Sequence, residues 1–382
     1  MQPMTPRERV RAALNHREPD RVPLDIGGGS STTLTEEASL QLNSYLGGVA
    51  PPQPMSSLFR TVRLDEEVLL RLGSDCRHLS VRGPASPIPA SVETIRDRWG
   101  VTWRRTYYGD LAYYWELHVH PLAAAEVGDL AGYLWPDPDD PALVAGVAEE
   151  ARYLSEMTDF AVMADCGFKS FWEQAYFLRG YEQLLADTAL NPSFVQALLD
   201  KLLEINLAAT GRFLDAAGPV IDVFRAGDDL ATQRGLLMSP AKFRQLLKPI
   251  YRQYFQFVRS RSNSKIFFHS CGNVAPLLED LMEIGVEIIN PVQSSALGDL
   301  VALKDQFRGR LAFWGGIDTQ HVLPRGSPDE VREEVRLRIQ QLGSGGGYVV
   351  ASVHNIQVDV PPANIVAMAD AVREFGAYPL TA

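Results

Sequence analysis

The feature of this sequence that most restricts its fold is a regular alternation of short apolar runs with longer amphipathic segments. The segments between the runs, such as 274–285 and 328–343, repeat their apolar residues with the period of a helix. Strands that are apolar on both faces and alternate with helices are typical of a parallel sheet covered by helices. The runs of strand length in the second half of the chain are 160–165, 220–226, 265–270, 287–292, 311–316 and 348–353.

Two earlier apolar runs, 21–26 and 76–81, bring the expected number of strands to about eight, the number in a closed (β/α)8 barrel. A doubly wound open sheet is the alternative. No expected strand is followed by the glycine fingerprint of a dinucleotide-binding fold, so the barrel is favoured. We therefore expect an α/β protein in which residues 1–382 form one TIM barrel domain.

Two additions to the barrel are expected. Thr5, Pro6 and Glu8 combine an N-cap, a first-turn proline and a capping box, which predicts an N-terminal helical extension over Pro6–Leu14. Residues 99–120 are rich in aromatic residues that alternate along the chain, which predicts a β-hairpin insertion.

Composition limits the partners and the compartment. The net charge of −11 disfavours nucleic acid and anionic membranes as partners, because both require a basic surface. No apolar stretch approaches the roughly 20 residues of a membrane-spanning helix. The first residues lack a secretory signal, and Cys76, Cys166 and Cys271 are too widely spaced for a disulfide framework. We expect a cytoplasmic protein.

Polar residues gather near the ends of the apolar runs. In a barrel the carboxyl ends of the strands form the catalytic face. Turn chemistry alone accounts for glycine, asparagine and aspartate at such positions, but it does not account for His269, Cys271 and His354. We expect one cavity to be surrounded by Asp25, Asp75, Asp228, His269, Gln293, Asp318 and His354.

The spacing of His269 and Cys271 favours a metal site. Residues two apart on a strand point to the same side, and His354, which follows the last run, approaches from further around the rim. Two nitrogens and one sulfur leave a fourth tetrahedral position open, as in catalytic zinc. Asp228, Glu173 or a water are candidates for that position. The alternative is that Cys271 is a small buried hydrophobe and that both histidines are ordinary hydrogen-bonding residues.

Two charged residues remain ambiguous from the sequence alone. Asp75 is either an acid in the loop before run 76–81 or a substrate contact. Arg225 lies inside an apolar run, where an arginine is costly unless it is paired. We expect Arg225 to contact Asp228 or a substrate carboxylate.

With these residues in place, the chain resembles the uroporphyrinogen decarboxylase superfamily, which also contains zinc-dependent, corrinoid-linked methyltransferases. The resemblance covers essentially the whole chain and implies a (β/α)8 barrel. It is carried by short motifs in a fixed order: TPRERVRAALNHREPDRVPLDIGG, LGSDCRHL, DRWGVTW, FWEQAYFLRG, AGDDLATQRGLLMSP, FFHSCGNVAPLLEDLMEIGVEIINPVQ, WGGIDTQHVLP and GGGYVVASVHNIQVDVPPANI.

The decarboxylase branch carries an Arg-Gln-x-Gly-Arg-Tyr stretch near the N-terminus, whose arginines bind the substrate carboxylates. The matching region here, 27–33, has no arginine. A substrate with eight carboxylates needs such fixed bidentate donors, so this departure disfavours that activity. Asp75 lies about where this branch has its catalytic aspartate.

The methyltransferase branch carries His-x-Cys on one strand and a further cysteine near the C-terminus. This chain has His269 and Cys271, and His354 stands where the second cysteine is expected. Imidazole in place of thiolate removes a negative charge and makes a bound zinc a stronger Lewis acid. Such a site suits polarising a methoxy or hydroxyl oxygen as well as activating a thiol.

The resemblance therefore implies a zinc-dependent methyltransferase similar to the methylcobamide:coenzyme M enzymes. It would use Zn²⁺ and a small-molecule substrate, with a corrinoid such as methylcobalamin supplied by a corrinoid-binding partner protein. The alternatives are a metal-free decarboxylase that uses Asp75, and a non-catalytic binding protein that kept the barrel. The expected roles are catalysis for Asp75 and Asp228, metal binding for His269, Cys271 and His354, and substrate contact for Asp25, Phe171, Glu173, Arg225, Gln293 and Asp318.

Overall fold

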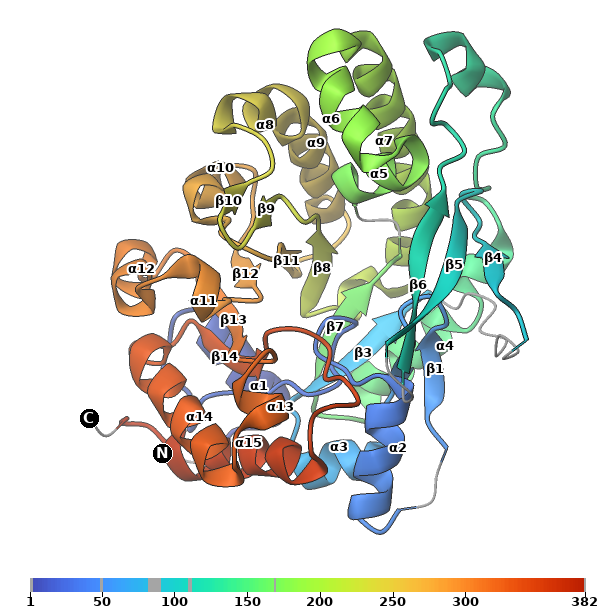
Figure 1. Cartoon of the computed structure of the whole chain (residues 1–382). Coiled ribbons are helices and arrows are strands. Elements are labelled where there is room, and N and C mark those ends of the chain that lie inside the picture. The colour runs from blue at the N-terminus through green and yellow to red at the C-terminus, as the bar shows by residue number, and fades with distance from the viewer. Residues whose placement is uncertain (1–2, 49–50, 82–90, 109–111, 168–169, 381–382) are drawn as a thin grey trace.

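The central element of the computed structural model is a curved parallel sheet with helices around it (Figure 1). The structure describes residues 3–48, 51–81, 91–108, 112–167 and 170–380. The order of the seven strands is β14-β13-β12-β11-β8-β7-β3, and all neighbours are parallel. Their bounds are β3 (Cys76–Ser80), β7 (Ala161–Asp165), β8 (Val223–Gly227), β11 (Lys265–His269), β12 (Ile288–Asn290), β13 (Ala312–Ile317) and β14 (Tyr348–Ser352).

Residues 22–26 close the gap between the two edge strands β14 and β3. Leu24 forms a parallel bridge with Val350 of β14, and the backbone N–H of Asp75 donates to the Leu24 carbonyl at 2.8 Å. Pro23 has no N–H to give, so this segment forms few ladder bonds and is no named strand. It nevertheless occupies the eighth position, and the predicted (β/α)8 barrel is confirmed.

Helices cover the outer face of the sheet (Figure 1). Their bounds are α2 (Glu36–Tyr45), α3 (Glu66–Leu72), α4 (Val147–Glu156), α5 (Trp172–Arg179), α6 (Tyr181–Leu190), α7 (Pro192–Ala217), α8 (Pro240–Leu246), α9 (Lys248–Arg259), α10 (Leu278–Glu283), α11 (Ser294–Leu297), α12 (Leu300–Phe307), α13 (Val322–Arg325), α14 (Pro328–Leu342) and α15 (Pro362–Phe375), with short 3-10 turns η1 (Val127–Gly132), η2 (Pro141–Val144), η3 (Gly218–Val220) and η4 (Ala275–Leu277). Among the described helices, none is both long and apolar enough to cross a bilayer.

The predicted N-terminal helix, α1 (Pro6–Leu14), closes the end of the barrel where the strands begin. Its capping box is formed, because the Thr5 hydroxyl accepts from the Glu8 amide and the Glu8 carboxylate accepts from the Thr5 amide. Val10 and Leu14 are buried in one cluster with inward-facing strand residues. With this end filled by apolar side chains, the carboxyl ends of the strands are left for chemistry.

The predicted hairpin insertion is also confirmed, with one strand more than expected. It contains β5 and β6, which pair antiparallel, and β4 along the outer side of β5. Residues 109–111, which lie between β5 and β6 in the sequence, are outside the described residues. The bounds are β4 (Thr94–Arg96), β5 (Thr102–Tyr108) and β6 (Ala112–Val119), and the two small ribbons elsewhere are β1 (Gln53–Ser56) with β2 (Thr61–Arg63) and β9 (Ala231–Thr232) with β10 (Gly235–Leu236).

Candidate active site

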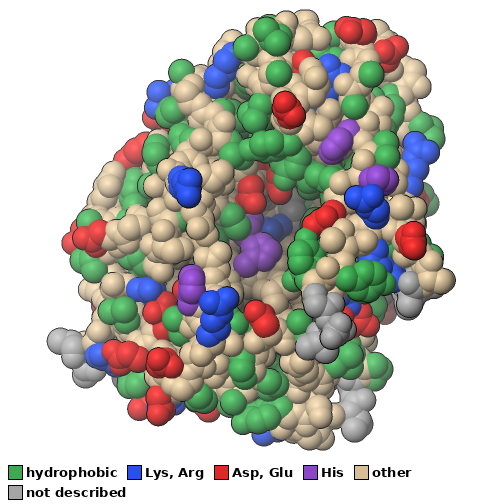
Figure 2. All heavy atoms as spheres, viewed as in Figure 1, with side chains coloured by type: hydrophobic (Ala, Val, Ile, Leu, Met, Phe, Trp, Pro, Cys, Tyr) green, Lys and Arg blue, Asp and Glu red, His purple; other side chains and the backbone are tan. Residues whose placement is uncertain are grey.

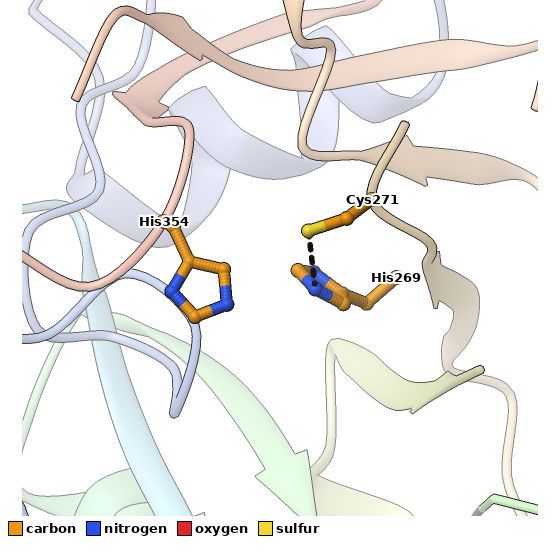
Figure 3. Close-up of side chains that lie close together, drawn as sticks. All are labelled: His269, Cys271 and His354. Atoms are coloured by element: carbon orange, nitrogen blue, oxygen red, sulfur yellow. Dashed lines mark hydrogen bonds between the residues drawn. The ribbon is translucent and has the colours of Figure 1, made fainter. Parts of the chain in front are cut away.

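Three side chains with metal-binding atoms meet at the carboxyl ends of the strands (Figure 3). His269 is the last residue of β11, Cys271 lies two residues further, and His354 follows β14. The nearest ligand atoms of the three all lie within 4.8 Å of one another. Cys271 Sγ is 3.5 Å from His269 Nε2, and the two imidazole ring centroids are 5.6 Å apart. The cluster of these three residues is called the His-Cys-His group below.

Asn290 fixes the protonation state of His269. The Asn290 side-chain amide donates to the backbone carbonyl of Trp314 at 2.9 Å, which turns its oxygen Oδ1 toward His269 Nδ1. That oxygen can only accept, so Nδ1 carries the proton and donates it. The lone pair of Nε2 then faces Cys271, which is the arrangement that a histidine needs to bind a metal.

Asp229 lies beside the His-Cys-His group. Its oxygen Oδ1 accepts from the Cys271 backbone N–H at 2.8 Å and lies 4.0 Å from His269 Nε2. Burial raises the pKa of the Cys271 thiol, and the charges of Asp229 and Glu173 raise it further. Desolvation lowers the pKa of His354, although the surface of this side chain is open to the cavity. The Cys271 thiol is therefore protonated unless a cation binds, since a metal ion favours the thiolate.

A cavity of about 330 Å³ opens next to the His-Cys-His group. Figure 2 shows the hollow in this face of the molecule, with histidine and acidic side chains at its centre. Gln293, a predicted substrate contact, lies in its wall and accepts from the Gly272 N–H at 3.3 Å. The residues around the cavity are Ala231, Thr232, Gln233, Cys271, Gly272, Gln293, Thr319, Gln320, Val353 and His354.

Asp228, predicted to surround the cavity and act in catalysis, does not line this cavity. The side chain is fully buried and accepts from the backbone N–H groups of residues 171–173 and from the Tyr251 hydroxyl. It supplies the cap of α5, whose own N-cap residue has no side-chain acceptor. Adjacent residues at a strand end face opposite ways, and Asp229 is the one that faces the His-Cys-His group.

Asp75, also predicted to surround the cavity and act in catalysis, lies at the opposite end of the barrel. It precedes the first residue of β3, where Arg9 and Arg21 donate to its carboxylate at 2.6 and 2.9 Å. The Leu24 N–H donates to the same group at 2.8 Å, and the side chain is 1% exposed. These contacts make Asp75 a structural anchor for the N-terminal segment. The error has a clear source, because Asp75 comes before its apolar run and not after it.

Asp25 and Phe171, both predicted as substrate contacts, are buried and do not line the cavity. Asp25 has no exposed surface and accepts from the Gly28 N–H, the Thr32 hydroxyl and the Trp314 indole N–H. It thereby holds the turn that follows residues 22–26.

The Phe171 ring is likewise closed off from the cavity. It has no exposed surface and packs edge to face on Tyr251 with centroids 4.9 Å apart. The ring belongs to the core between α5 and α9.

The other predicted contacts lie around the mouth with different roles. Arg225 pairs with Asp165 at 3.3 Å and donates to the Ser31 hydroxyl, so its predicted contact with Asp228 is wrong. Asp318 accepts from two backbone N–H groups of the turn after β13. Glu173 lies in the first turn of α5, close enough to affect the pKa of Cys271.

Several residues of the site escape prediction from sequence. Asn290 stands inside an apolar run, and its role depends on a distant backbone carbonyl. Asp229 is distinguished from its neighbour only by the direction in which each points. The polar side chains of the cavity wall come from loops several residues beyond the strands: Thr232, Gln233, Thr319 and Gln320.

Comparison with known proteins decides the family. Residues 120–375 match the family described as Uroporphyrinogen decarboxylase (URO-D). The chain belongs to the uroporphyrinogen decarboxylase family. Among solved structures, a methyltransferase from Methanosarcina mazei has the same fold, with a TM-score of 0.65 and 21% identity over 97% of this chain and 99% of that one.

Curated relatives from the uroporphyrinogen decarboxylase superfamily carry two different activities in their names. A uroporphyrinogen decarboxylase from Pseudomonas savastanoi pv. phaseolicola is 25% identical over 49% of this chain and 50% of its own length. A methylcobamide:CoM methyltransferase, MtaA, from Methanosarcina barkeri is 29% identical over 48% of this chain and 49% of its own length. The matches span about half the length of these relatives, and the two identities are similar. The choice between the activities therefore depends on the site.

Proposed function

We propose that this member of the uroporphyrinogen decarboxylase family is a zinc-dependent methyltransferase. It moves a methyl group between a small-molecule substrate and the corrinoid, such as methylcobalamin, of a separate corrinoid-binding protein. The observation that carries the proposal is the His-Cys-His group, whose ligand atoms lie within 4.8 Å of one another beside the cavity.

The donor set fits zinc. Two imidazole nitrogens and one thiolate are typical ligands of this ion, and three protein ligands leave a position for a substrate, as in catalytic sites. Asn290 already turns the lone pair of His269 Nε2 toward the group, so no change of tautomer is needed. The ion would supply Lewis acidity, which activates a thiol or polarises a substrate oxygen.

The residues around the group support this role. Asp229 replaces Asp228 as the candidate for the fourth position, because its oxygen is 4.0 Å from His269 Nε2. Glu173 and Gln293 remain our candidates for substrate contact, and Asp318 for shaping the loop beside the cavity.

The described residues form one barrel, so we assign residues 1–382 to a single domain and place the corrinoid on a partner. The three free cysteines suit the cytoplasm.

The structure gives less support to the decarboxylase alternative. Asp75, the expected catalytic aspartate of that branch, is engaged by two arginines at the far end of the barrel. Among the described residues that line the cavity there is no arginine or lysine to bind substrate carboxylates. Asp75 therefore lies away from the cavity, and the basic residues that would bind substrate carboxylates are missing from the described cavity wall.

Metal analysis of the purified chain, combined with a methyl-transfer assay that uses methylcobalamin, tests the proposal. We expect stoichiometric zinc in the natural chain, strong loss of zinc in Cys271→Ser, and no loss in Cys166→Ser. Cys166 is a matched control because it is a buried cysteine outside the His-Cys-His group, and its thiol contacts Thr210 and Tyr254. Full zinc retention by Cys271→Ser would refute the assignment of the ligands.

A further inference from the structure

The described residues that line the cavity include no aspartate, glutamate, lysine or arginine. Five of its side chains carry an amide or a hydroxyl group, and its remaining members apart from Cys271 and His354 are small or apolar. The amides can both donate and accept hydrogen bonds. The five are Thr232, Gln233, Gln293, Thr319 and Gln320.

The charges near this wall do not favour an anion. Asp229 lies against Cys271, with its carboxylate 2.8 Å from the Cys271 backbone nitrogen, and no described residue lining the cavity is a lysine or an arginine. Arg225 faces the barrel interior two positions before the end of β8. Its charge is balanced by Asp165 at 3.3 Å, and its Nε donates to Ser31 at 3.0 Å.

A bound zinc ion would not change this balance much. The Cys271 thiolate and the Asp229 carboxylate together would offset its two positive charges. An anionic ligand would then lose its water without gaining a charged partner, which is costly inside a protein. A ligand with hydroxyl, ether or amide groups would instead exchange its water for the amide and hydroxyl groups of the wall.

We infer that the small molecule bound here is uncharged and is held through hydroxyl, ether or amide groups. This inference rests on the proposed function and narrows it to one class of methyl donor or acceptor. The cavity volume of about 330 Å³ lies near the small end of the range for ligand sites, roughly 300–1,000 Å³. A site built on neutral hydrogen bonds discriminates strongly against ligands that leave its polar groups unpaired.

Two thiols that differ only in their head group test the inference. 2-Mercaptoethanol is uncharged and 2-mercaptoethanesulfonate is anionic, while both offer the same thiol to the metal. Calorimetric titration of the zinc-loaded protein should give a dissociation constant at least about tenfold lower for 2-mercaptoethanol. Equal affinity, or tighter binding of the sulfonate, would overturn the inference.

A charge placed in the wall provides the matched comparison. Gln233 is exposed and contacts Gln320 at 3.1 Å, so Gln233→Arg adds a cation without disturbing the core. We expect this variant to bind the sulfonate at least about tenfold more tightly than the natural chain does, so that the preference for 2-mercaptoethanol narrows or reverses. Gln233→Met, which has a similar size and no charge, should leave the sulfonate affinity low.

Zinc content measured on the same samples separates this inference from the proposed function. A protein without zinc would refute the proposed function, and the inference would fall with it. A protein that holds zinc but prefers the sulfonate, or binds neither thiol, would refute the inference alone.

Discussion

Replacing Asn290 by alanine removes the contact that orients His269 without touching the His-Cys-His group itself. The Asn290 side chain is fully buried and makes two hydrogen bonds, one to His269 Nδ1 and one to the Trp314 carbonyl. After the substitution, His269 can rotate or change tautomer, and Nε2 is no longer held with its lone pair toward Cys271. We expect weaker metal binding as the direct consequence.

The size of the effect follows from these two contacts. Loss of the group that orients a metal-bound histidine typically weakens metal affinity about 10- to 100-fold, or about 1.4 to 2.7 kcal/mol. The buried Trp314 carbonyl and His269 Nδ1 also lose their partner, at about 1 to 3 kcal/mol each. The free energy of unfolding should therefore fall by about 2 to 6 kcal/mol.

Asn364 provides the control for the loss of stability. Its buried amide donates to the carbonyls of Leu323 and Gly326 at 2.8 and 2.7 Å, outside the His-Cys-His group. Asn364→Ala should lower the free energy of unfolding by a similar amount and leave metal affinity unchanged. Asn290→Asp keeps an acceptor for His269 and should keep metal affinity, although it loses the donor to Trp314.

The assays are urea denaturation for stability and competition with a chromophoric chelator for zinc affinity. Equal zinc affinity in Asn290→Ala and the natural chain would refute the role of Asn290. Equal losses of affinity in Asn290→Ala and Asn364→Ala would show that the effect comes from stability alone.

Three further predictions concern stability, pH and substrate. Asp75→Asn should lower the free energy of unfolding by about 3 to 5 kcal/mol, because Arg9 and Arg21 would lose a buried charged partner. Zinc content should stay unchanged, and an unchanged urea midpoint would contradict the prediction. Burial raises the pKa of Asp25 from 3.8 to about 6, so its contribution to stability is fully present below about pH 4 and is lost as the pH rises through about 6. The difference in unfolding free energy between the natural chain and Asp25→Asn should change over that interval, and a constant difference would refute the shift. Uroporphyrinogen III, supplied as substrate, should yield no coproporphyrin at rates near ~1 s⁻¹, as followed by chromatography of the oxidised products, and product formation at such rates would favour the decarboxylase.

The barrel could be predicted because its signal is local. A parallel strand with helices on one side and side chains filling the barrel on the other is apolar on both faces, so each strand is visible as an uninterrupted run. The run 21–26 shows the limit of this rule. It occupies a strand position, but Pro23 has no N–H to donate and Leu24 forms an isolated bridge with Val350. The segment therefore makes few backbone hydrogen bonds to the neighbouring strands.

The site was predictable in part for the same reason. His269 and Cys271 are two residues apart, so their convergence is expected from strand geometry. In the structure β11 ends at His269, and Cys271 lies in the turn that follows, where its backbone N–H donates to Asp229. The approach of His354 depends on the barrel bringing the last strand around to β11, which the fold prediction already contained. The sequence prediction placed Asp75 at the wrong end of the barrel. A residue that follows a strand lies at the carboxyl end of the barrel, but Asp75 precedes β3 and therefore lies at the opposite end.

The remaining errors concern the direction in which a side chain points and the residue that it contacts. Neither is encoded in a single apolar run. Asp228 and Asp229 have the same chemistry and adjacent positions, and the choice between them depends on where α5 begins. The start of that helix needs an acceptor that Phe171 cannot supply, so Asp228 turns toward it and Asp229 is left beside the His-Cys-His group.

His354 stands where the methyltransferases that the chain resembles are expected to have a cysteine, and this difference affects the charge around the site. In the methyltransferases that the chain resembles, a second cysteine would add a negative charge to the metal. Here that charge is absent from the ligand position, while Asp229 supplies one from a carboxylate 4.0 Å from His269 Nε2. The negative charge of Asp229 lies beside the Cys271 loop, against the Cys271 backbone N–H. A ligand entering the cavity would therefore meet a neutral imidazole and uncharged amides, which is the environment expected for an uncharged substrate.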